Sequence, residues 1–304
     1  MSVRVTLIHN PAAGRQCAGE ATQLHNFLSV AGHEVRYQSA KEDGWKRALK
    51  KPADLIVVAG GDGTVAKVTR RMVGRGVPVA VLPSGTANNI ARTLGLVERP
   101  FEELVRGWER PRRVKLDVGI AAGPWGERYF VESVGAGLFA GVLASPSRKE
   151  LKKGKKGKAA VESALRRLRE AALRCESLEV TAALDGRDIS GRYLLLEAVN
   201  LPYVGPNLHL AHDSQPGDGQ FDVVLVTEAE RERLLYYLEH WQENRERIGM
   251  LPTRRGRRLQ IEWTGFALHI DDKLLPKAKA KPKEIAGLVE ARIDGAAVEF
   301  LVPA

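Results

Sequence analysis

One carboxylate stands among three glycines in the segment Gly60-Gly61-Asp62-Gly63-Thr64. The residues before it, 55–59, are apolar, which is typical of a strand buried on both faces of a parallel sheet. Glycines let backbone N–H groups approach a ligand, and a helix expected from about Thr64 adds free N–H groups and a positive dipole end. The segment therefore favours a bound phosphate, although it lacks the spacing of a Walker loop.

Asp62 would repel a phosphate unless it acts through a cation. Mg²⁺ prefers oxygen ligands and is commonly held by one or two carboxylates together with phosphates. We therefore interpret Asp62 as a metal-binding or catalytic carboxylate. The alternative is a glycine-rich turn in which Asp62 caps the following helix.

Two further apolar runs end in the same way, one before residues 10–15 and one before residues 84–89. Taken singly, Asn-Pro and Ser-Gly dipeptides are typical of ordinary turns. Three such loops after neighbouring parallel strands would meet at one edge of a sheet, where ligands bind in this class of fold. The predicted nucleotide-binding residues are Asn10, Pro11, Gly14, Gly60, Gly61, Gly63, Thr64, Ser84, Gly85, Thr86 and Asn88.

The elements that position these loops alternate between β-branched runs and amphipathic stretches. This pattern predicts a parallel sheet with helices on its faces. We expect strands at about 3–9, 34–38, 54–59 and 77–82, and helices at about 20–30, 45–50, 64–73 and 88–94.

The sequence pattern changes after Pro111: most segments are typical of strands, and two helical patterns interrupt them. We expect strands at about 114–120, 128–134, 178–184, 193–200, 221–226, 259–263, 267–270 and 298–302, with helices at about 159–173 and 229–246. This order predicts a second, mainly antiparallel domain. The expected domains are a nucleotide-binding α/β domain over residues 1–112 and a β-rich domain over residues 113–304.

The 304-residue chain carries a formal net charge of +10 and a sequence pI of about 9.7, which favours anionic partners. Its two cysteines, Cys17 and Cys175, have no spacing typical of a disulfide framework or a zinc site, so we expect a reducing cytoplasm. We see neither a signal peptide nor an apolar run long enough for a membrane span.

Basic residues cluster in Ser147–Lys158, Thr253–Arg258 and Lys277–Lys283. Such tracts are often solvated loops, but near an anionic leaflet each Lys or Arg contributes about 1 kcal/mol of binding. The tracts lack interleaved aromatic residues and any recognition module, so we do not expect nucleic-acid binding.

The motifs NPAAG, GGDGTV and LPSGTANNIAR, in this order, resemble the catalytic-domain signature of the diacylglycerol kinase and sphingosine kinase superfamily, particularly its soluble bacterial lipid kinases. Pro202–Val226 resembles a segment of the family's second domain. The resemblance implies an N-terminal three-layer α/β domain like that of NAD kinase and phosphofructokinase, a C-terminal β-sandwich-like domain, and an ATP site in the cleft between them.

Further site residues follow from the resemblance. The family's Mg²⁺ site falls on Asp218, with the backbone carbonyls of Gln215 and Gln220 beside it. Asp117 matches a carboxylate of the family's acidic network. From the residues alone, Gly217-Asp218-Gly219 is equally well a tight turn, and a lone Asp in a strand is more often a hydrogen-bonded residue.

The chain departs from the family pattern in two places. Asn89 stands where the family often has Asp. Where the family has Asp-Gly-Glu, this chain has Asp271-Asp272-Lys273, and a protonated lysine cannot accept a proton from an alcohol. Asp271 or Asp272 could supply the carboxylate after a small shift. Alternatively, the kinase loses only part of its rate without a base, because positioning and charge stabilisation contribute most, or the kinase activity has been lost.

The resemblance predicts an ATP- and Mg²⁺-dependent lipid kinase, cytoplasmic and peripherally associated with the inner face of the membrane. Its catalytic residues would be Asp62, Asp117, Asp271 and Asp272. The alternatives are a small-molecule kinase of the NAD-kinase type and a catalytically weak lipid-binding regulatory protein. The sequence does not specify the lipid or the oligomeric state.

Overall fold

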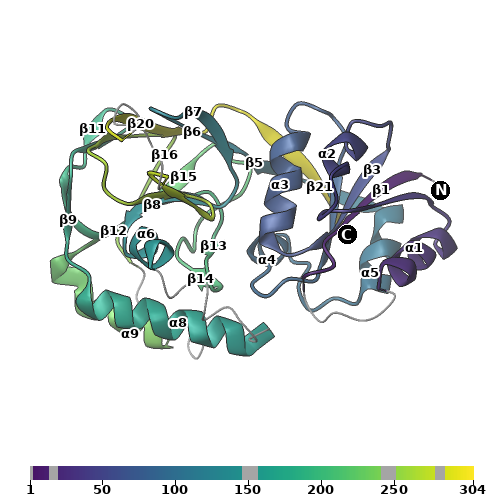
Figure 1. The fold of residues 1–304 in the computed structure, drawn as a ribbon, viewed down its shortest axis with the longest axis horizontal. Helices are drawn as coiled ribbons and strands as arrows, with labels where there is room; N and C mark the ends of the chain where they lie inside the picture. Colours follow the sequence, from purple (N-terminus) through teal and green to yellow (C-terminus); the bar gives the residue numbers. More distant parts are fainter. Residues whose placement is uncertain (1–2, 14–19, 146–156, 241–250, 278–284) are drawn as a thin grey trace. The chain divides into compact units, whose positions relative to one another are not determined.

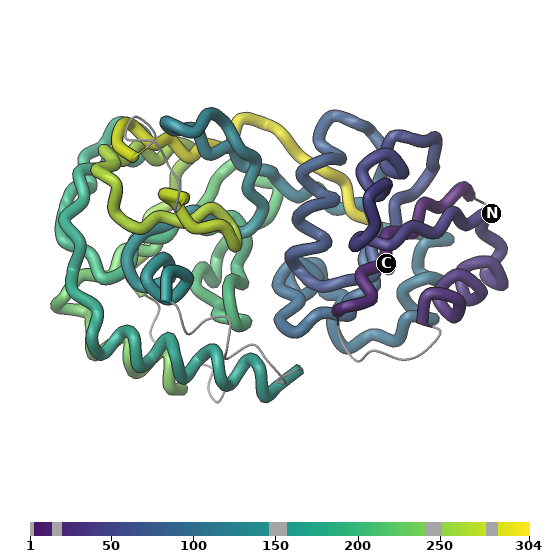
Figure 2. The backbone as a smooth tube through the Cα atoms, viewed as in Figure 1, coloured from purple at the N-terminus to yellow at the C-terminus, as the bar shows by residue number. Residues whose placement is uncertain are grey.

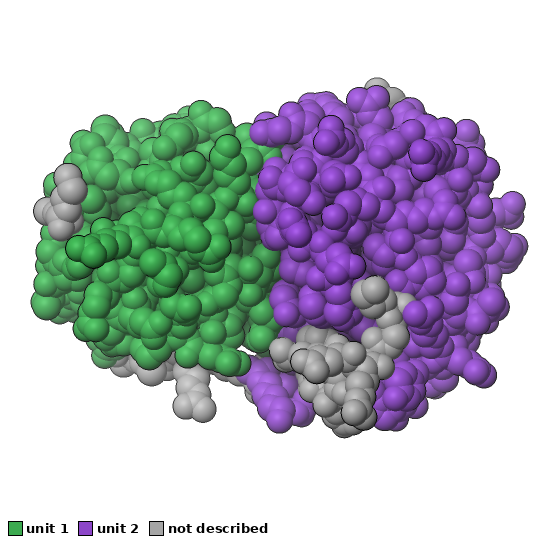
Figure 3. Space-filling view, turned by 180° about the vertical axis from the view of Figure 1, so that it is seen from behind, with its two compact units in different colours: residues 1–116, 296–304 green, residues 117–295 purple. Residues whose placement is uncertain are grey.

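The computed structural model describes residues 3–13, 20–145, 157–240, 251–277 and 285–304. The chain forms two compact units, coloured separately in Figure 3: unit 1 contains residues 1–116 and 296–304, and unit 2 contains residues 117–295. The sequence had placed residues 296–304 with the second domain. They belong instead to unit 1, because the last strand lies beside β4 and buries Phe300 completely; Figure 2 shows this yellow segment returning to the first unit.

Unit 1 is built on one six-stranded sheet with the strand order β2-β1-β3-β4-β21-β5. The pairs β1/β2, β1/β3, β3/β4 and β4/β21 are parallel, so β1, β3 and β4 end at the same edge. All six residues of β3 are buried, as expected for a central parallel strand. The bounds are β1 Arg4–His9, β2 Glu34–Ser39, β3 Leu55–Gly60, β4 Val79–Pro83, β5 Pro111–Asp117 and β21 Ala297–Pro303.

Helices cover both faces of this sheet: α3 and α4 lie on one face, and α1 and α5 lie on the other (Figure 1). This confirms the predicted α/β layering. Helix α3 begins at Asp62, two residues earlier than expected, so Gly61 is its N-cap. The bounds are α1 Glu20–Val30, α2 Trp45–Ala48, α3 Asp62–Met72, α4 Asn89–Thr93, α5 Phe101–Arg106 and the 3-10 turn η1 Gly107–Glu109.

Unit 2 contains two sheets that share a core. The first has the order β11-β10-β17-β20-β6-β7, and the second has the order β16-β15-β12-β8-β18-β19, with β9 beside β12. Apolar residues from both, such as Ile261 in the first sheet and Leu196 in the second, pack in one cluster. The two sheets therefore form a sandwich, as predicted.

Helices α6, α8 and α9 cover the other face of the second sheet through an apolar cluster that includes Phe139, Leu165 and Leu238. Figure 1 shows α8 and α9 side by side. Among the described residues, no helix is long and apolar enough to cross a membrane. The helices and the 3-10 turn of unit 2 are α6 Leu138–Ala144, α8 Gly157–Arg174, η2 Glu228–Glu230 and α9 Arg231–His240.

The strands of unit 2 are short apart from β12, which lies at the centre of the second sheet. Their bounds are β6 Gly119–Gly123, β7 Gly126–Phe130, β8 Ser133–Gly137, β9 Leu178–Val180, β10 Ala182–Leu184, β11 Arg187–Asp188, β12 Gly191–Val199, β13 Tyr203–Val204, β14 Leu208–His209, β15 Phe221–Thr227, β16 Thr253–Gly256, β17 Arg258–Trp263, β18 Leu268–Ile270, β19 Lys273–Leu275 and β20 Gly287–Arg292.

Candidate active site

The loops after β1 and β3 are joined by a side-chain hydrogen bond. Asn10 Nδ2 donates to Thr64 Oγ1 at 3.0 Å. The Asn10 backbone N–H donates to the Ala59 carbonyl at 2.9 Å, and its side-chain oxygen accepts from the Ala12 N–H at 3.2 Å. Asn10 is thus fixed on both sides, and it holds the first loop against the start of α3.

The loops after β3 and β4 touch backbone to backbone. A Cβ added to Gly85 would lie 2.3 Å from the Gly61 Cα, and one added to Gly61 would lie 2.8 Å from the Gly85 Cα. No side chain fits at such distances, so both positions require glycine. The Ser84 N–H also donates to the Gly60 carbonyl at 3.2 Å. The three predicted loops therefore meet at one edge of the sheet.

Asn88 shapes the third loop. It adopts a left-handed backbone conformation with φ of 55°, which Asn tolerates better than most residues. Its side chain closes the turn in both directions: the Gly85 N–H donates to Oδ1 at 2.9 Å, and Nδ2 donates to the Gly85 carbonyl at 3.0 Å. These bonds keep Gly85 against Gly61.

Asp62 lies in the first turn of α3 and points toward α4. Its Oδ1 accepts a hydrogen bond from the Ile90 N–H at 3.0 Å. Burial raises the pKa of Asp62, and backbone N–H groups at the start of α4 oppose that rise. Asp62 therefore accepts a hydrogen bond from the start of α4, the helix after the third loop. The helix-capping alternative had expected it to cap α3, its own helix.

The remaining predicted residues of this edge fall into two groups. Pro11, Gly63 and Thr86 are exposed. A Cβ added to Gly63 would meet nothing within 4 Å, so this position is open. Gly14 lies outside the described residues.

A pocket begins beside the bond between Asn10 and Thr64 and extends toward β2. The sequence reasoning did not identify Lys41, Trp45 and Lys67, which contribute to its wall. The helical spacing of Thr64, Lys67 and Val68 could have shown that these three share one face of α3. The lining residues are Ile8, Asn10, Ala40, Lys41, Trp45, Thr64, Lys67 and Val68.

In unit 2, a buried asparagine connects two of the predicted carboxylate residues. Asp117 is 4% exposed, and its Oδ2 accepts from the Gly219 N–H at 2.7 Å. Asn200 Nδ2 donates to the backbone carbonyls of Asp117 and Val131, both at 2.8 Å. The Val131 N–H in turn donates to Asp271 Oδ1 at 3.1 Å. The sequence reasoning missed Asn200, although a polar residue directly after the apolar β12 was a signal.

The two carboxylates proposed to replace the missing glutamate have partners. Asp271 Oδ1 accepts from three consecutive backbone N–H groups, those of residues 131–133, at 2.8–3.3 Å. Asp272 is half-exposed and forms an ion pair with Lys273 at 2.7 Å. In this conformation Asp271 stabilises the chain between β7 and β8, and Lys273 neutralises its neighbour.

The predicted metal site does not fit Mg²⁺. The Gln215 carbonyl accepts from the Asp218 N–H at 3.3 Å, and Asp218 Oδ1 accepts from the Gln220 N–H at 2.9 Å. Asp218 Oδ2 faces the guanidinium of Arg255 at 3.8 Å. Within the described ranges, no group of three or more His, Cys, Asp or Glu side chains is placed to hold a metal ion.

A buried acid–base pair, unforeseen from the sequence, lies on β12 and β18, the two strands that flank β8. Glu197 and His269 are 0% and 3% exposed, and Glu197 Oε2 lies 2.9 Å from His269 Nε2. Both residues pair in register with Gly135, where an added Cβ would lie 1.8 Å from Glu197 Oε2. Burial alone would lower the pKa of His269, but the charge and hydrogen bond of Glu197, with the Asp271 carbonyl, raise it.

Comparisons with known proteins fit this arrangement. Residues 4–121 match the family model described as the diacylglycerol kinase catalytic domain. The diacylglycerol kinase of Bacillus subtilis is 28% identical to this chain over 244 residues, which is 74% of each chain. The chain is thus similar to the diacylglycerol kinase family, both in its catalytic domain and, at low identity, over most of its length. The predicted family resemblance is thereby confirmed.

Solved structures extend the similarity of fold over nearly the whole chain. A diacylglycerol kinase from Bacillus anthracis superposes with a TM-score of 0.68 at 20% identity, covering 98% of this chain and 96% of that one. Yeast NADH kinase superposes with a TM-score of 0.53 at 10% identity, covering 99% of this chain and 83% of that one. The similarity of fold therefore extends over unit 2, beyond the matched residues 4–121.

Proposed function

We propose that this protein is an ATP-dependent lipid kinase that transfers the γ-phosphate of ATP to a lipid hydroxyl. The main observation that supports this proposal is that three loops lie together at the ends of β1, β3 and β4. Backbone contact between Gly61 and Gly85, together with the side-chain bond from Asn10 to Thr64, creates a narrow edge of backbone groups and short side chains at the start of α3. Such an edge suits phosphate oxygens, which accept hydrogen bonds from backbone N–H groups.

The loops would act mainly by positioning. Kinase transition states are stabilised by orienting the transferred phosphoryl group and by neutralising its charge. Mg²⁺ bound to the nucleotide would supply part of that neutralisation. Lys41 and Lys67, which line the adjoining pocket, would add positive charge near the phosphates. Asp62 would lie beside the phosphates, at the junction of the second and third loops.

Three carboxylates are candidates for receiving the proton of the lipid hydroxyl. Asp117 is buried and bonded to Gly219, and Asp271 is held by three N–H groups, so both would serve chiefly as positioning residues. Asp272 is half-exposed and is the candidate best placed to reach solvent. Because a loose phosphoryl-transfer transition state needs little base assistance, an Asp272→Asn variant should retain most of its activity.

We further propose that the enzyme works at the inner face of an anionic membrane. Among the described residues, four arginines are exposed: Arg254 and Arg255 on β16, Arg257 in the bend that follows, and Arg258 at the start of β17. Such a cluster adds attraction to an anionic leaflet, where a diacylglycerol-like or sphingoid substrate would reside. The other two predicted basic tracts lie largely outside the described residues.

The test is incubation of the full chain with Mg·ATP and a total bacterial lipid extract, followed by mass spectrometry. A lipid that gains one phosphate is the expected product. Asp62→Asn should reduce this conversion at least about a hundredfold, the scale expected for loss of one catalytic electrostatic group. Its thermal stability should stay level or rise near neutral pH, because burial raises the pKa of Asp62 and disfavours its ionised form in the folded protein.

Other outcomes would favour the alternatives. Phosphate transfer to NAD rather than to any lipid would indicate a small-molecule kinase. Binding to anionic vesicles without ATP turnover would favour a lipid-binding regulatory protein, consistent with the engaged carboxylates at residues 271 and 272. Lipid phosphorylation that survives Asp62→Asn would refute the assignment of the site.

A further inference from the structure

One arginine faces three acceptors around residues 213–222 of unit 2. Arg255 Nε lies 3.3 Å from Asp222 Oδ1, and Nη1 lies 3.8 Å from Asp218 Oδ2. Nη2 donates to the backbone carbonyl of Asp213 at 2.5 Å. Each nitrogen of the guanidinium is therefore directed at a different point on the same segment.

The sheet places this arginine. Arg255 on β16 pairs in register with Asp222 on β15, which is 6% exposed. A nearly buried carboxylate needs a partner, and a planar guanidinium with five N–H donors can serve several acceptors at once. The pairing of β15 with β16 thus fixes one end of the arginine's contacts.

The loop ahead of β15 completes the arrangement. It turns tightly, with φ of 93° at Gly217 and 78° at Gly219. The turn is held by the bond from the Gln220 N–H to Asp218 Oδ1 and by the bond from the Gly219 N–H to Asp117. Arg255 then draws together the start of the segment at Asp213, its turn at Asp218 and its end at Asp222.

These contacts lie where the family resemblance places a divalent cation. An ion on Asp218 would stand close to the positive charge of Arg255, and the two would repel each other. It would also need the Gln215 carbonyl, which accepts from the Asp218 N–H. The guanidinium of Arg255 therefore already supplies a positive charge beside Asp218.

We propose that Arg255 is a built-in cation that orders residues 213–222, so that this chain holds the segment without a divalent ion. Like a bound metal ion, the guanidinium would hold together the carboxylates of Asp218 and Asp222 and the backbone carbonyl of Asp213. Ordering of this part of unit 2 would then be insensitive to chelators.

The test uses the full chain without nucleotide or lipid. Calorimetric titration with MgCl₂ should show no saturable binding, and the melting temperature should be the same in Mg²⁺ and in EDTA. Arg255→Met should lower the melting temperature by about 3–6 °C. Arg254→Met is the matched control, because Arg254 is the exposed neighbour opposite Val223 and should melt like the wild type.

Two results would overturn the proposal. One is saturable binding of Mg²⁺ by the wild type that Asp218→Asn abolishes. The other is an Arg255→Met protein that melts like Arg254→Met. If Arg255→Met does not fold, Arg255→Lys keeps the charge but loses the planar fork, and it should melt below both the wild type and Arg254→Lys. None of these readouts depends on kinase activity, so they can fail or succeed independently of the proposed function.

Discussion

The two units satisfy their polar groups in different ways. At the loop edge of unit 1, the backbones of two loops come into contact because Gly61 and Gly85 have no side chains. Short side chains join the loops elsewhere, as in the hydrogen bond between Asn10 and Thr64. In unit 2, charged side chains on separate strands are buried and matched in pairs, as Glu197 and His269 are. A sandwich interior must neutralise what it buries, whereas a strand-end edge can leave backbone groups facing a ligand.

The largest expected effect comes from breaking the pair in unit 2. Glu197→Ala should cost about 3–5 kcal/mol of folding free energy, because it leaves the buried imidazole of His269 without its acidic partner. Urea unfolding at pH 6.5 measures this. Glu262→Ala, on the exposed face of β17, is the control and should change stability by about 0.5 kcal/mol or less. If Glu197→Ala and Glu262→Ala unfold at the same urea concentration, the buried pair does not stabilise unit 2 in the way proposed.

The same pair predicts a dependence on pH. The pKa of His269 is raised above 6.5, so its contribution to stability is complete below about pH 6.5 and is lost as the pH rises through the folded-state pKa. Wild-type stability measured from pH 6 to pH 9 should therefore fall more than that of Glu197→Gln. Parallel curves for the two proteins would contradict this origin of the pH dependence.

The next effect concerns the edge of unit 1. Gly85→Ala forces a Cβ against the Gly61 Cα and should cost about 2–3 kcal/mol, with loss of nucleotide binding. Gly63→Ala is the control for folding, since its Cβ would enter open space and the helical position favours alanine. We expect its melting temperature to stay level or rise. If Gly63→Ala also loses nucleotide affinity while remaining stable, the ligand approaches that backbone directly.

This contrast also explains what the sequence could predict. Most of the strands and helices of unit 1 that were expected begin and end within about two residues of their predicted bounds, because the apolar runs and glycine-rich ends are local signals. The strand expected at about 114–120 is an exception, since β5 lies three residues earlier, at Pro111–Asp117. Glu197 and His269 are 72 residues apart, and Asp222 and Arg255 are 33 residues apart. Such pairs depend on strand register in an antiparallel sandwich, which no local pattern reveals. For the same reason, the contact of Asp218 with Arg255 and the partners of Asp271 could not be anticipated.

A smaller effect is expected at Asp271. Asp271→Asn removes the charge that three N–H groups share and should cost about 2 kcal/mol. Asn tolerates the left-handed conformation of residue 271, where φ is 48°, so the backbone is not the cause. Asp272→Asn is the control and should lie within about 0.5 kcal/mol of the wild type. A larger loss for Asp272→Asn would reverse the roles assigned to the two carboxylates.

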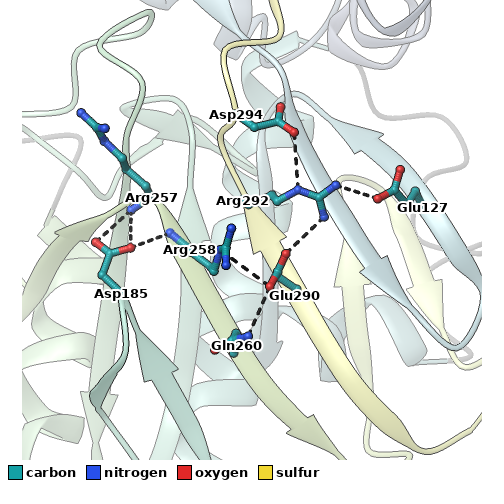
Figure 4. A network of polar contacts seen from close by, with 8 residues as sticks. All are labelled: Glu127, Asp185, Arg257, Arg258, Gln260, Glu290, Arg292 and Asp294. Carbon is teal, nitrogen blue, oxygen red and sulfur yellow. Dashed lines mark hydrogen bonds and ion pairs between the residues drawn. The ribbon is translucent and has the colours of Figure 1, made fainter.

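The smallest effect is expected at Arg292, on the outer face of unit 2. Its three nitrogens face Glu127 at 2.6 Å, Glu290 at 3.2 Å and Asp294 at 3.4 Å (Figure 4). Like Arg255, it joins three acceptors, but Glu127 and Asp294 are 63% and 45% exposed, so water and salt screen the contacts.

Arg292→Ala should therefore cost about 1 kcal/mol or less in low salt, and most of that loss should disappear in 1 M NaCl. Arg255→Met provides the comparison within the same unit, because Asp222 is nearly buried and its contact is screened less. Urea unfolding of both variants at low and high salt measures the difference. If the two losses shrink equally with salt, burial of the acceptors does not separate the two arginines, and Arg255 is an ordinary surface contact.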